Sequence, residues 1–383
     1  MLRIIHCITD EKFVDCIIAT FDFLQDRSIS RYVHITNNAN QQFRYLHKFE
    51  GVEYVNISQF LSVLYSGDCD IVFLHNLQSM PLKFISKIPK AVKVVWLSWG
   101  FDIYGHMGSR PLVPIPNLLQ PETRKLLWDK QLISKLKNLY KITRNRQLKK
   151  AVARVDYYSG IIPEEYNMMS KVPFFHAKQI DFRYATPLSD ITLSLLETEK
   201  PVNGRNILIG NSGDPSNNHV DIFLKLSNLN LSERYIYVPL SYGDDFRYIK
   251  KIKELGVKLW GDYFVALDNF LPYNEYKEII SSCGFRFFGH ERQQALGNIN
   301  LALMDGCKLF LSDTSVLWRH LKKMGINLYS IQKDINQECL SSNMDIEKNN
   351  ENRKIIIEDL LTSTQINRLY DMIEFFKLEI KQC

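Results

Sequence analysis

The residues best suited to bind a ligand form a glycine-rich polar segment that directly follows a short apolar run, 207–209. A segment of this kind between a strand and a helix directs unpaired backbone N–H groups, and the positive end of the helix dipole, towards an anion. The sequence therefore predicts a site for a phosphate-bearing ligand, with an ordinary turn capped by Ser216 or Asn217 as the alternative. The predicted ligand contacts in this segment are Gly210, Asn211, Ser212, Gly213, Asp214, Ser216 and Asn217.

Two further polar loops follow predicted strands in the second half of the chain, at 239–244 and 289–298. In the second loop Arg292 can form forked hydrogen bonds to phosphate and offset the charge of a departing diphosphate. Glu291 can bind a ribose or sugar hydroxyl. A surface loop with one ion pair is the alternative interpretation. The other predicted ligand contacts in these loops are Ser241, Tyr242, Gln293, Gln294, Gly297 and Asn298.

In the first half, Asp102 follows a predicted strand at 93–98. A carboxylate in that place can act as the general base that takes a proton from an acceptor hydroxyl, although a single Asp also fits a helix cap or a hydrogen-bond anchor. Asp68 and Asp70 match a D-x-D pattern, but they precede their strand and are interpreted as a turn. The sequence contains no H-E-x-x-H, Walker loop or nucleophile elbow, so we expect neither a metal nor a cofactor.

The segment 121–154 carries most of the positive charge. It has eleven basic and two acidic residues, whereas the whole chain has a net charge of +6. At helical spacing its apolar and basic side chains separate onto opposite faces, which predicts an amphipathic helix on an anionic membrane surface. A helix packed on its own domain is the alternative, and nucleic acid is not expected as a partner. The predicted membrane contacts are Trp128, Lys130, Lys137, Lys141, Arg144 and Arg146.

The elements that must position these residues alternate between short strand patterns and helical patterns, which indicates parallel sheets covered by helices. A length of 383 residues favours about two domains. The predicted fold is α/β, with two Rossmann-like domains that face each other across a cleft. The boundaries are 1–190 for the first domain, including the segment 121–154, 200–355 for the second, and 356–383 for a helix that returns to the first.

Three local features of the second half are also predicted. Gly256 is expected just beyond the end of a helix, and a strand is expected close to 258–259. The Asn-rich, charged stretch 341–353 is expected to be a mobile loop.

Seven scattered cysteines without a C-x-x-C pair favour a reducing compartment. The N-terminal apolar run is too short for a signal peptide, and no window of about eighteen apolar residues occurs. We therefore expect a cytoplasmic protein without a membrane-spanning segment.

Four of the segments above occur in one order in a known family, over residues 90–330. The chain resembles the bacterial 4-acetamido-4,6-dideoxygalactose (N-acetylfucosamine-type) transferases that act on lipid-linked oligosaccharides in enterobacterial common antigen and O-antigen assembly. The segments that carry the resemblance are Trp99–Tyr104, Ile209–Asp214 with Ser216–His219, Val238–Tyr242 and Arg292–Gly297.

The resemblance implies an inverting GT-B glycosyltransferase without a metal. Its second domain would hold a dTDP-sugar, and its first domain would meet a polyprenyl-diphosphate-linked saccharide acceptor. The protein would then be peripheral, at the cytoplasmic face of the bacterial inner membrane. Another dideoxy or acetamido sugar is an open alternative for the donor. A sugar-nucleotide epimerase and a non-catalytic nucleotide-sugar-binding membrane protein are alternatives for the function.

Overall fold

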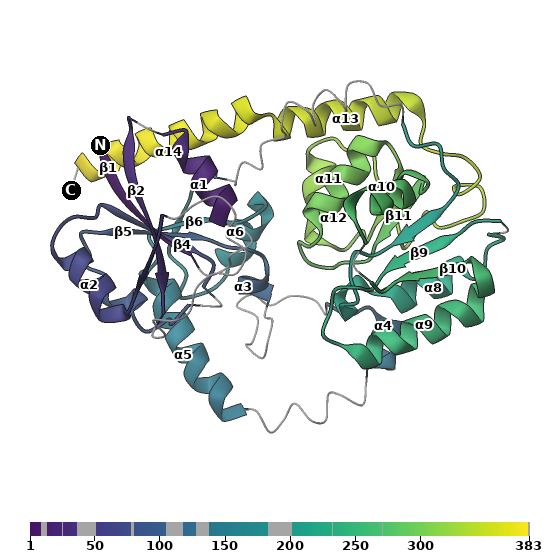
Figure 1. The fold of residues 1–383 in the computed structure, drawn as a ribbon, viewed down its shortest axis with the longest axis horizontal. Coiled ribbons are helices and arrows are strands. Elements are labelled where there is room, and N and C mark those ends of the chain that lie inside the picture. The colour runs from purple at the N-terminus through teal and green to yellow at the C-terminus, as the bar shows by residue number, and fades with distance from the viewer. Residues whose placement is uncertain are drawn as a thin grey trace. The chain divides into compact units, whose positions relative to one another are not determined.

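The computed structural model describes residues 1–8, 14–24, 26–36, 51–77, 80–104, 118–127, 138–182, 201–231, 233–269 and 271–381 (Figure 1). The chain divides into two compact units. Unit 1 consists of Met1–Ile115, Lys137–Leu188 and Leu360–Cys383. Unit 2 consists of Pro116–Leu136 and Ser189–Asp359. Each unit is built around its own parallel sheet.

The sheet of unit 1 has seven parallel strands in the order β3-β2-β1-β4-β5-β6-β7. Its central strand β4 has the sequence Ile-Val-Phe-Leu-His, and all five residues are buried. Continuous burial is expected because helices cover both faces of a parallel sheet. The strands are β1 (Leu2–Cys7), β2 (Ser28–Ile35), β3 (Val52–Val55), β4 (Ile71–His75), β5 (Lys93–Leu97), β6 (Tyr157–Ser159) and β7 (Lys178–Gln179).

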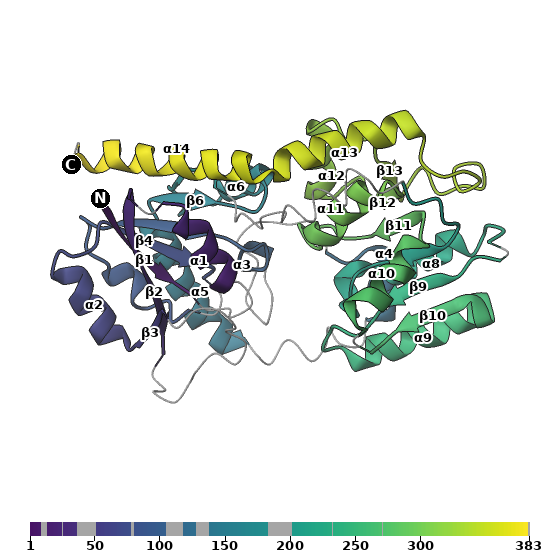
Figure 2. The same cartoon turned by 45° about the horizontal axis from the view of Figure 1, so that its top comes forward.

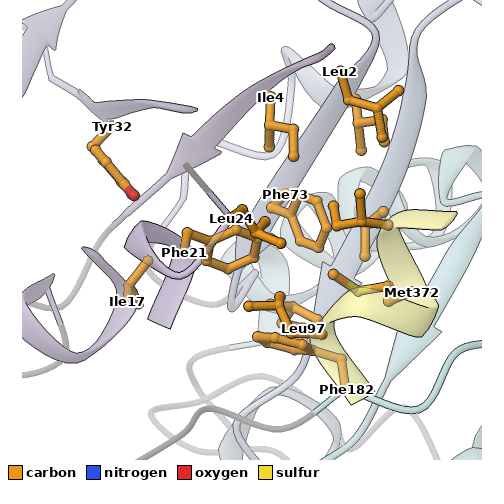
Figure 3. Close-up of a cluster of buried hydrophobic side chains, with 14 of the residues drawn as sticks. Leu2, Ile4, Ile17, Phe21, Leu24, Tyr32, Phe73, Leu97, Phe182 and Met372 are labelled. Atoms are coloured by element: carbon orange, nitrogen blue, oxygen red, sulfur yellow. The ribbon is translucent and has the colours of Figure 1, made fainter. Parts of the chain in front are cut away.

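The helices of unit 1 include the last helix of the chain, α14. It contributes Leu369, Met372, Ile373 and Phe376 to the core around β1 and β4. Figure 3 shows Met372 directed into this cluster, towards Phe73 and Leu97. The helices are α1 (Val14–Asp22), α2 (Ile57–Tyr65), the 3-10 helix η2 (Ile85–Lys87), α3 (Phe101–Tyr104), α5 (Asn138–Arg154), α6 (Pro163–Met169) and α14 (Thr362–Lys381).

The sheet of unit 2 has six parallel strands in the order β10-β9-β8-β11-β12-β13. Both sheets therefore have the 3-2-1-4-5-6 order of a Rossmann fold. This confirms the predicted fold class of two Rossmann-like domains. The strands of unit 2 are β8 (Ile207–Ile209), β9 (Ile236–Pro239), β10 (Phe264–Leu267), β11 (Phe285–Phe288), β12 (Lys308–Leu311) and β13 (Tyr329–Ser330).

Helices cover both faces of this second sheet (Figure 2). They are α4 (Pro121–Leu126), the 3-10 helix η5 (Pro215–Asn217), α8 (His219–Leu226), α9 (Phe246–Trp260), the 3-10 helix η6 (Gly261–Tyr263), α10 (Tyr273–Ser281), α11 (Leu296–Asp305), α12 (Val316–Lys323) and α13 (Ile346–Leu360).

The segment 121–154 is divided between the two units, which corrects the prediction of one helix in the first domain. α4 belongs to unit 2, and α5 belongs to unit 1. α4 ends at Leu126, and the next residue, Leu127, has φ −104° and ψ 6°, outside helical geometry. Asp221 of α8 accepts the backbone N–H groups of Glu122 and Thr123 at 2.9 Å each, so α4 is held on unit 2 by contacts that a helical wheel cannot show.

Two predictions for the second half are wrong at the level of local elements. α9 runs to Trp260, so Gly256 lies inside a helix and the next strand, β10, begins later at Phe264. A side chain at position 256 would collide with the Phe264 ring, and this close approach is what the glycine permits.

The Asn-rich stretch predicted as a loop enters helix α13. Asn352 is buried there, and its side chain accepts the Asn327 N–H at 2.7 Å and donates to the Asn327 carbonyl at 3.0 Å. These tertiary hydrogen bonds offset the low helix propensity of asparagine.

Candidate active site in the second unit

The candidate site lies at the carboxyl ends of β8 and β11. These strands are adjacent in the sheet, but the chain leaves them in opposite directions, towards β9 and towards β12. In an open α/β sheet such a switch point leaves a crevice for a ligand. The loop after β8 is 210–218, and the loop after β11 is 289–295. Both contain predicted site residues, so the structure brings the two predicted loops together.

The loop after β8 is organised by the buried side chain of Asn217. Its Oδ1 accepts the Asn211 N–H at 2.9 Å, and its Nδ2 donates to Ser212 Oγ at 3.1 Å. Gly210 begins the loop with φ +74°, a conformation that favours glycine. Asp214 Oδ1 accepts the Ser216 N–H at 2.8 Å and so caps η5. The alternative of a helix capped by Ser216 or Asn217 is wrong for α8, whose N-cap residue is Asn218 and has no side-chain cap hydrogen bond within the described residues.

Two buried histidines support this loop without carrying charge. Burial lowers the pKa of both His219 and His290 to about 3. His290 Nε2 lies 2.9 Å from Asn217 Oδ1, and His219 Nδ1 lies 3.0 Å from the Tyr248 hydroxyl. Both rings are therefore neutral at physiological pH and serve as hydrogen-bonding supports.

Polar side chains connect the two loops. Arg292 Nε donates to Gln294 Oε1 at 2.9 Å. The Ser216 hydroxyl lies 2.8 Å from the same oxygen and 2.5 Å from Asp214 Oδ1, so its single proton serves one acceptor at a time. Gln294 Nε2 lies 3.5 Å from Asn211 Oδ1. The half-buried guanidinium of Arg292 is thus positioned beside the glycine-rich loop.

The same loop leads directly into the N-terminus of α11. Ala295 precedes the helix with φ +59°, and none of the described side chains caps the helix start. A left-handed alanine is uncommon and costs conformational energy. The uncapped N–H groups carry the positive end of the helix dipole. Together with Arg292 they can stabilise an anion.

Glu291 has a different environment from the one predicted. Only 7% of it is exposed. Its Oε1 accepts the Ser312 hydroxyl at 2.6 Å and the Gln120 amide at 2.9 Å, and its Oε2 accepts the Thr314 hydroxyl at 2.6 Å. These contacts join the loops after β11 and β12 to the segment before α4. Their geometry is that of a positioning residue, and contact with a sugar or ribose stays a prediction.

The segment before α4 contributes residues that the sequence analysis did not identify. The Gln120 N–H donates to Asn218 Oδ1 at 2.8 Å, and Asn218 Nδ2 donates to the Leu118 carbonyl at 3.1 Å and to the Gly289 carbonyl at 2.6 Å. Asn218 has φ +54°. No local pattern indicates these contacts, because Gln120 and Asn218 are about a hundred positions apart.

A pocket of about 560 Å³ opens beside Glu291. It lies between α4, α8 and the residues that follow β12 and β13. Its lining includes Gln120, Arg124, Lys225, Glu291, Thr314 and Gln332.

The remaining predicted donor contacts surround the same sheet edge. Tyr242 is 65% exposed, and its carbonyl accepts the Gly213 N–H at 2.5 Å, so the loops after β8 and β9 are joined. Ser241 and Gly297 are exposed, and Gln293 and Asn298 are half-buried.

Asp102 belongs to unit 1. It is 6% exposed, and its Oδ2 accepts three N–H groups: Trp96 Nε1 at 3.0 Å, the Leu77 N–H at 3.2 Å and the Trp99 N–H at 3.4 Å. This arrangement suits the anchor that the sequence left open as an alternative. A role as the general base stays a prediction.

Most of the predicted membrane contacts cannot be placed. Trp128, Lys130 and Lys137 lie outside the described residues, and of Lys141 and Arg144 only the position in α5 is described. Arg146 is exposed on α5. Within the described residues no helix is both long and apolar enough to cross a membrane. The same residues contain no cluster of three or more potential metal ligands.

Comparison with known structures supports the fold. A UDP-forming α,α-trehalose-phosphate synthase from Burkholderia xenovorans has a TM-score of 0.59 at 9% identity, with 98% of this chain and 100% of that chain covered. Anabaena HepE, in complex with UDP and glucose, has a TM-score of 0.58 at 11% identity, with 98% and 100% covered. The lipopolysaccharide outer core galactosyltransferase WaaB has a TM-score of 0.58 at 12% identity, with 98% and 99% covered.

These structures share two Rossmann-like domains in the GT-B arrangement, so the fold of this chain is GT-B. The sequence profile of one family matches residues 133–356, more than half of the chain. The protein is therefore a glycosyltransferase and belongs to glycosyl transferase group 56, the 4-alpha-L-fucosyltransferase family.

Proposed function

We propose that the protein transfers a 4-acetamido-4,6-dideoxyhexose-type sugar from a dTDP-sugar to a polyprenyl-diphosphate-linked saccharide, with inversion and without a metal. The reaction would serve O-antigen or enterobacterial common antigen assembly. One observation carries the proposal: Arg292, the glycine-rich loop and the uncapped start of α11 meet at the switch point of unit 2. A cation and N–H groups in one crevice can take up the charge that develops on a leaving diphosphate.

The comparisons support a nucleotide sugar as the donor, and the family description is relevant to the type of sugar that is transferred. The family description names a fucosyl group, which is a 6-deoxyhexose. Anabaena HepE was crystallised with UDP and glucose. A pocket of about 560 Å³ on the same sheet edge is large enough for the nucleoside part. We retain dTDP from the sequence resemblance and treat UDP as the competing nucleotide.

The proposed roles follow from the charge of each side chain and from the hydrogen bonds that it already makes within the protein. Arg292 stabilises the departing nucleotide, and the loop 210–217 with Gln294 holds the diphosphate. Glu291 positions the loops. Asp102 anchors the segment after β5, and its action as base is the alternative. The basic residues of α5 and of the preceding segment meet the inner-membrane surface that holds the acceptor.

The decisive experiment measures nucleotide release from dTDP-, UDP- and GDP-linked 6-deoxy and 4-acetamido sugars, with and without a polyprenyl-diphosphate saccharide. We expect release to depend on the acceptor and to be fastest with the dTDP-linked 4-acetamido sugar, in the presence of EDTA. Isomerisation of the donor without acceptor would identify an epimerase. Faster turnover of another donor would reject the proposed sugar while leaving the transferase assignment in place.

A further inference from the structure

The outer face of α9 in unit 2 combines apolar and basic residues that no neighbouring element covers among the described residues. Phe246, the first residue of the helix, is 79% exposed, and Val257 is 58% exposed. The opposite side of the helix buries Tyr248 and Ile252 in the core of unit 2. The exposure of the two apolar side chains therefore does not arise from a poorly packed helix.

The exposed residues of α9 form an ordered pattern. At about 100° per residue, Phe246 and Val257 lie about 20° apart around the axis and roughly 16 Å apart along it. Lys250 lies between them, with 79% of its side chain exposed. Arg247 and Lys258 follow on the adjoining side of the helix, and both are exposed. An apolar line bordered by cations is the pattern of a helix at a lipid–water interface.

Cations outnumber acidic groups on and beside this face. The cations are Arg247, Lys250, Lys251, Lys253 and Lys258, and the exposed acidic groups are Asp244, Glu254, Asp262 and Asp268, of which Asp268 is paired with Lys253. Glu254 lies 3.9 Å from Lys250. Lys251 donates to the Leu126 carbonyl at 2.9 Å, so α9 touches the end of α4, where the strongly basic part of the sequence begins.

We propose that this α9 face, defined as Phe246, Arg247, Lys250, Val257 and Lys258, is a contact surface for an anionic lipid membrane. Phe246 and Val257 enter the interface, and the cations meet lipid phosphates. The surface is distinct from the predicted membrane contacts on α5, because α9 belongs to unit 2 and α5 belongs to unit 1.

The position of this surface gives it a function in the proposed reaction. The loop before α9 is bonded to the loop after β8, because the Tyr242 carbonyl accepts the Gly213 N–H. Lipid contact at the first turns of α9 would therefore hold the glycine-rich loop close to the membrane. This consequence rests on the proposed lipid-linked acceptor, whereas the lipid contact itself does not.

The test is partition of the whole protein onto vesicles of phosphatidylcholine, with and without phosphatidylglycerol. The basic variant is Arg247→Gln/Lys250→Gln/Lys258→Gln, and the apolar variant is Phe246→Ser. A matched control, Lys322→Gln/Lys323→Gln/Lys354→Gln, removes the same charge from exposed positions of α12 and α13. Each variant is also made in a background with Lys137, Lys141, Arg144 and Arg146 changed to Gln.

We expect the basic variant to lose about fivefold in partition per cation, on the order of 100-fold, only on vesicles with phosphatidylglycerol. The apolar variant should lose about tenfold, and the control should change less than twofold. Equal behaviour of the basic variant and the control in both backgrounds would overturn the proposal. Normal vesicle binding combined with lost capture of a protein partner would also overturn it.

Nucleotide-sugar binding is measured separately, by calorimetry without vesicles. Failure of the unmodified protein to bind any nucleotide sugar would reject the proposed function but not the lipid contact. Loss of vesicle binding by the basic variant, with unchanged nucleotide-sugar binding, supports the lipid surface.

Discussion

The two sheets have the same strand order, yet their switch points contain different chemistry. In unit 1, β1 and β4 meet at His6 and His75, whose ring nitrogens are 3.0 Å apart and whose side chains are fully buried. In unit 2, β8 and β11 meet at the glycine-rich loop and Arg292, which remains half-buried. A shared topology therefore creates a comparable place in both units, but the residue types decide what that place can bind.

The difference is also electrostatic. Burial lowers the pKa of His75 to about 3 and that of His6 well below its ordinary value, so the pair in unit 1 is neutral. Tyr32 and Phe73 stack on the His6 ring. Unit 2 also has neutral histidines, and its described residues add a guanidinium and an uncapped helix start. These charges support the proposal that unit 2 binds the anion.

Removal of the Arg292 guanidinium from unit 2 should have the largest effect on activity. We expect Arg292→Ala to lower kcat/KM by about 10²- to 10³-fold, because a charged donor to the leaving group is lost. Arg292→Lys should recover part of the loss, since an ammonium keeps the charge but not the forked geometry. Steady-state kinetics with the preferred donor measures both. Normal turnover of Arg292→Ala would remove the basis for distinguishing the two switch points.

Backbone geometry provides the second test. Gly210→Ala should reduce the free energy of unfolding by about 2–4 kcal/mol. Its φ is +74°, and a Cβ would lie 2.6 Å from His219 Nε2 and 2.8 Å from Asn217 Oδ1. Gly51→Ala is the matched control, because no heavy atom lies within 4 Å of its added Cβ. Denaturant unfolding with equal losses in the two variants would contradict the described loop geometry.

In unit 1 the informative change is Asp102→Asn. If Asp102 is an anchor, one amide oxygen retains some of the three N–H bonds, and we expect a loss of about 1–3 kcal/mol of stability with most turnover kept. If Asp102 is the general base, turnover should be abolished with little loss of stability. Parallel measurement of unfolding and turnover separates the two roles.

The smallest expected effects are those of pH on the free energy of unfolding, and their sign differs between two buried groups. His290 has a pKa of about 3 in the folded protein, against an ordinary value of 6.5. Its contribution to stability is therefore complete above pH 6.5 and is lost as the pH falls towards 3. Burial raises the pKa of Glu165 in unit 1 to about 8 from 4.5, so its contribution is complete below pH 4.5 and is lost as the pH rises through 8.

Each slope should reach at most about 1.4 kcal/mol per pH unit. His290→Gln should flatten the free energy of unfolding below pH 6.5, and Glu165→Gln should flatten it between pH 4.5 and 8. Denaturant unfolding at several pH values measures both slopes. Unchanged slopes would show that these groups titrate normally in the folded protein.

Much of the fold could be predicted because it depends on local patterns. The strand predicted at 93–98 is observed as β5 (Lys93–Leu97), since an apolar run ended by polar residues and glycine marks a buried parallel strand. The helix bounds were less predictable where a tertiary contact decided them. Gly256 resembles a helix end, but it lies inside α9 because the Phe264 ring packs against it.

The candidate site could be predicted in part for the same reason. The loop after β8 and Arg292 were recognisable from residue type and from their position after strands. Gln120 and Asp221 were not, because their role depends on α4 lying on unit 2, about a hundred residues away along the chain. Glu291 was recognised as chemically capable, but its partners Ser312 and Thr314 already occupy both of its oxygens.

The sequence by itself determined the two α/β halves and the polar loops that follow their strands, because periodicity and turn residues act over a few positions. Only the tertiary structure decided which loops share an edge, which carboxylates are occupied and to which unit the segment 116–136 belongs. These outcomes depend on hydrogen bonds and packing between residues far apart in the chain, and no local pattern encodes them.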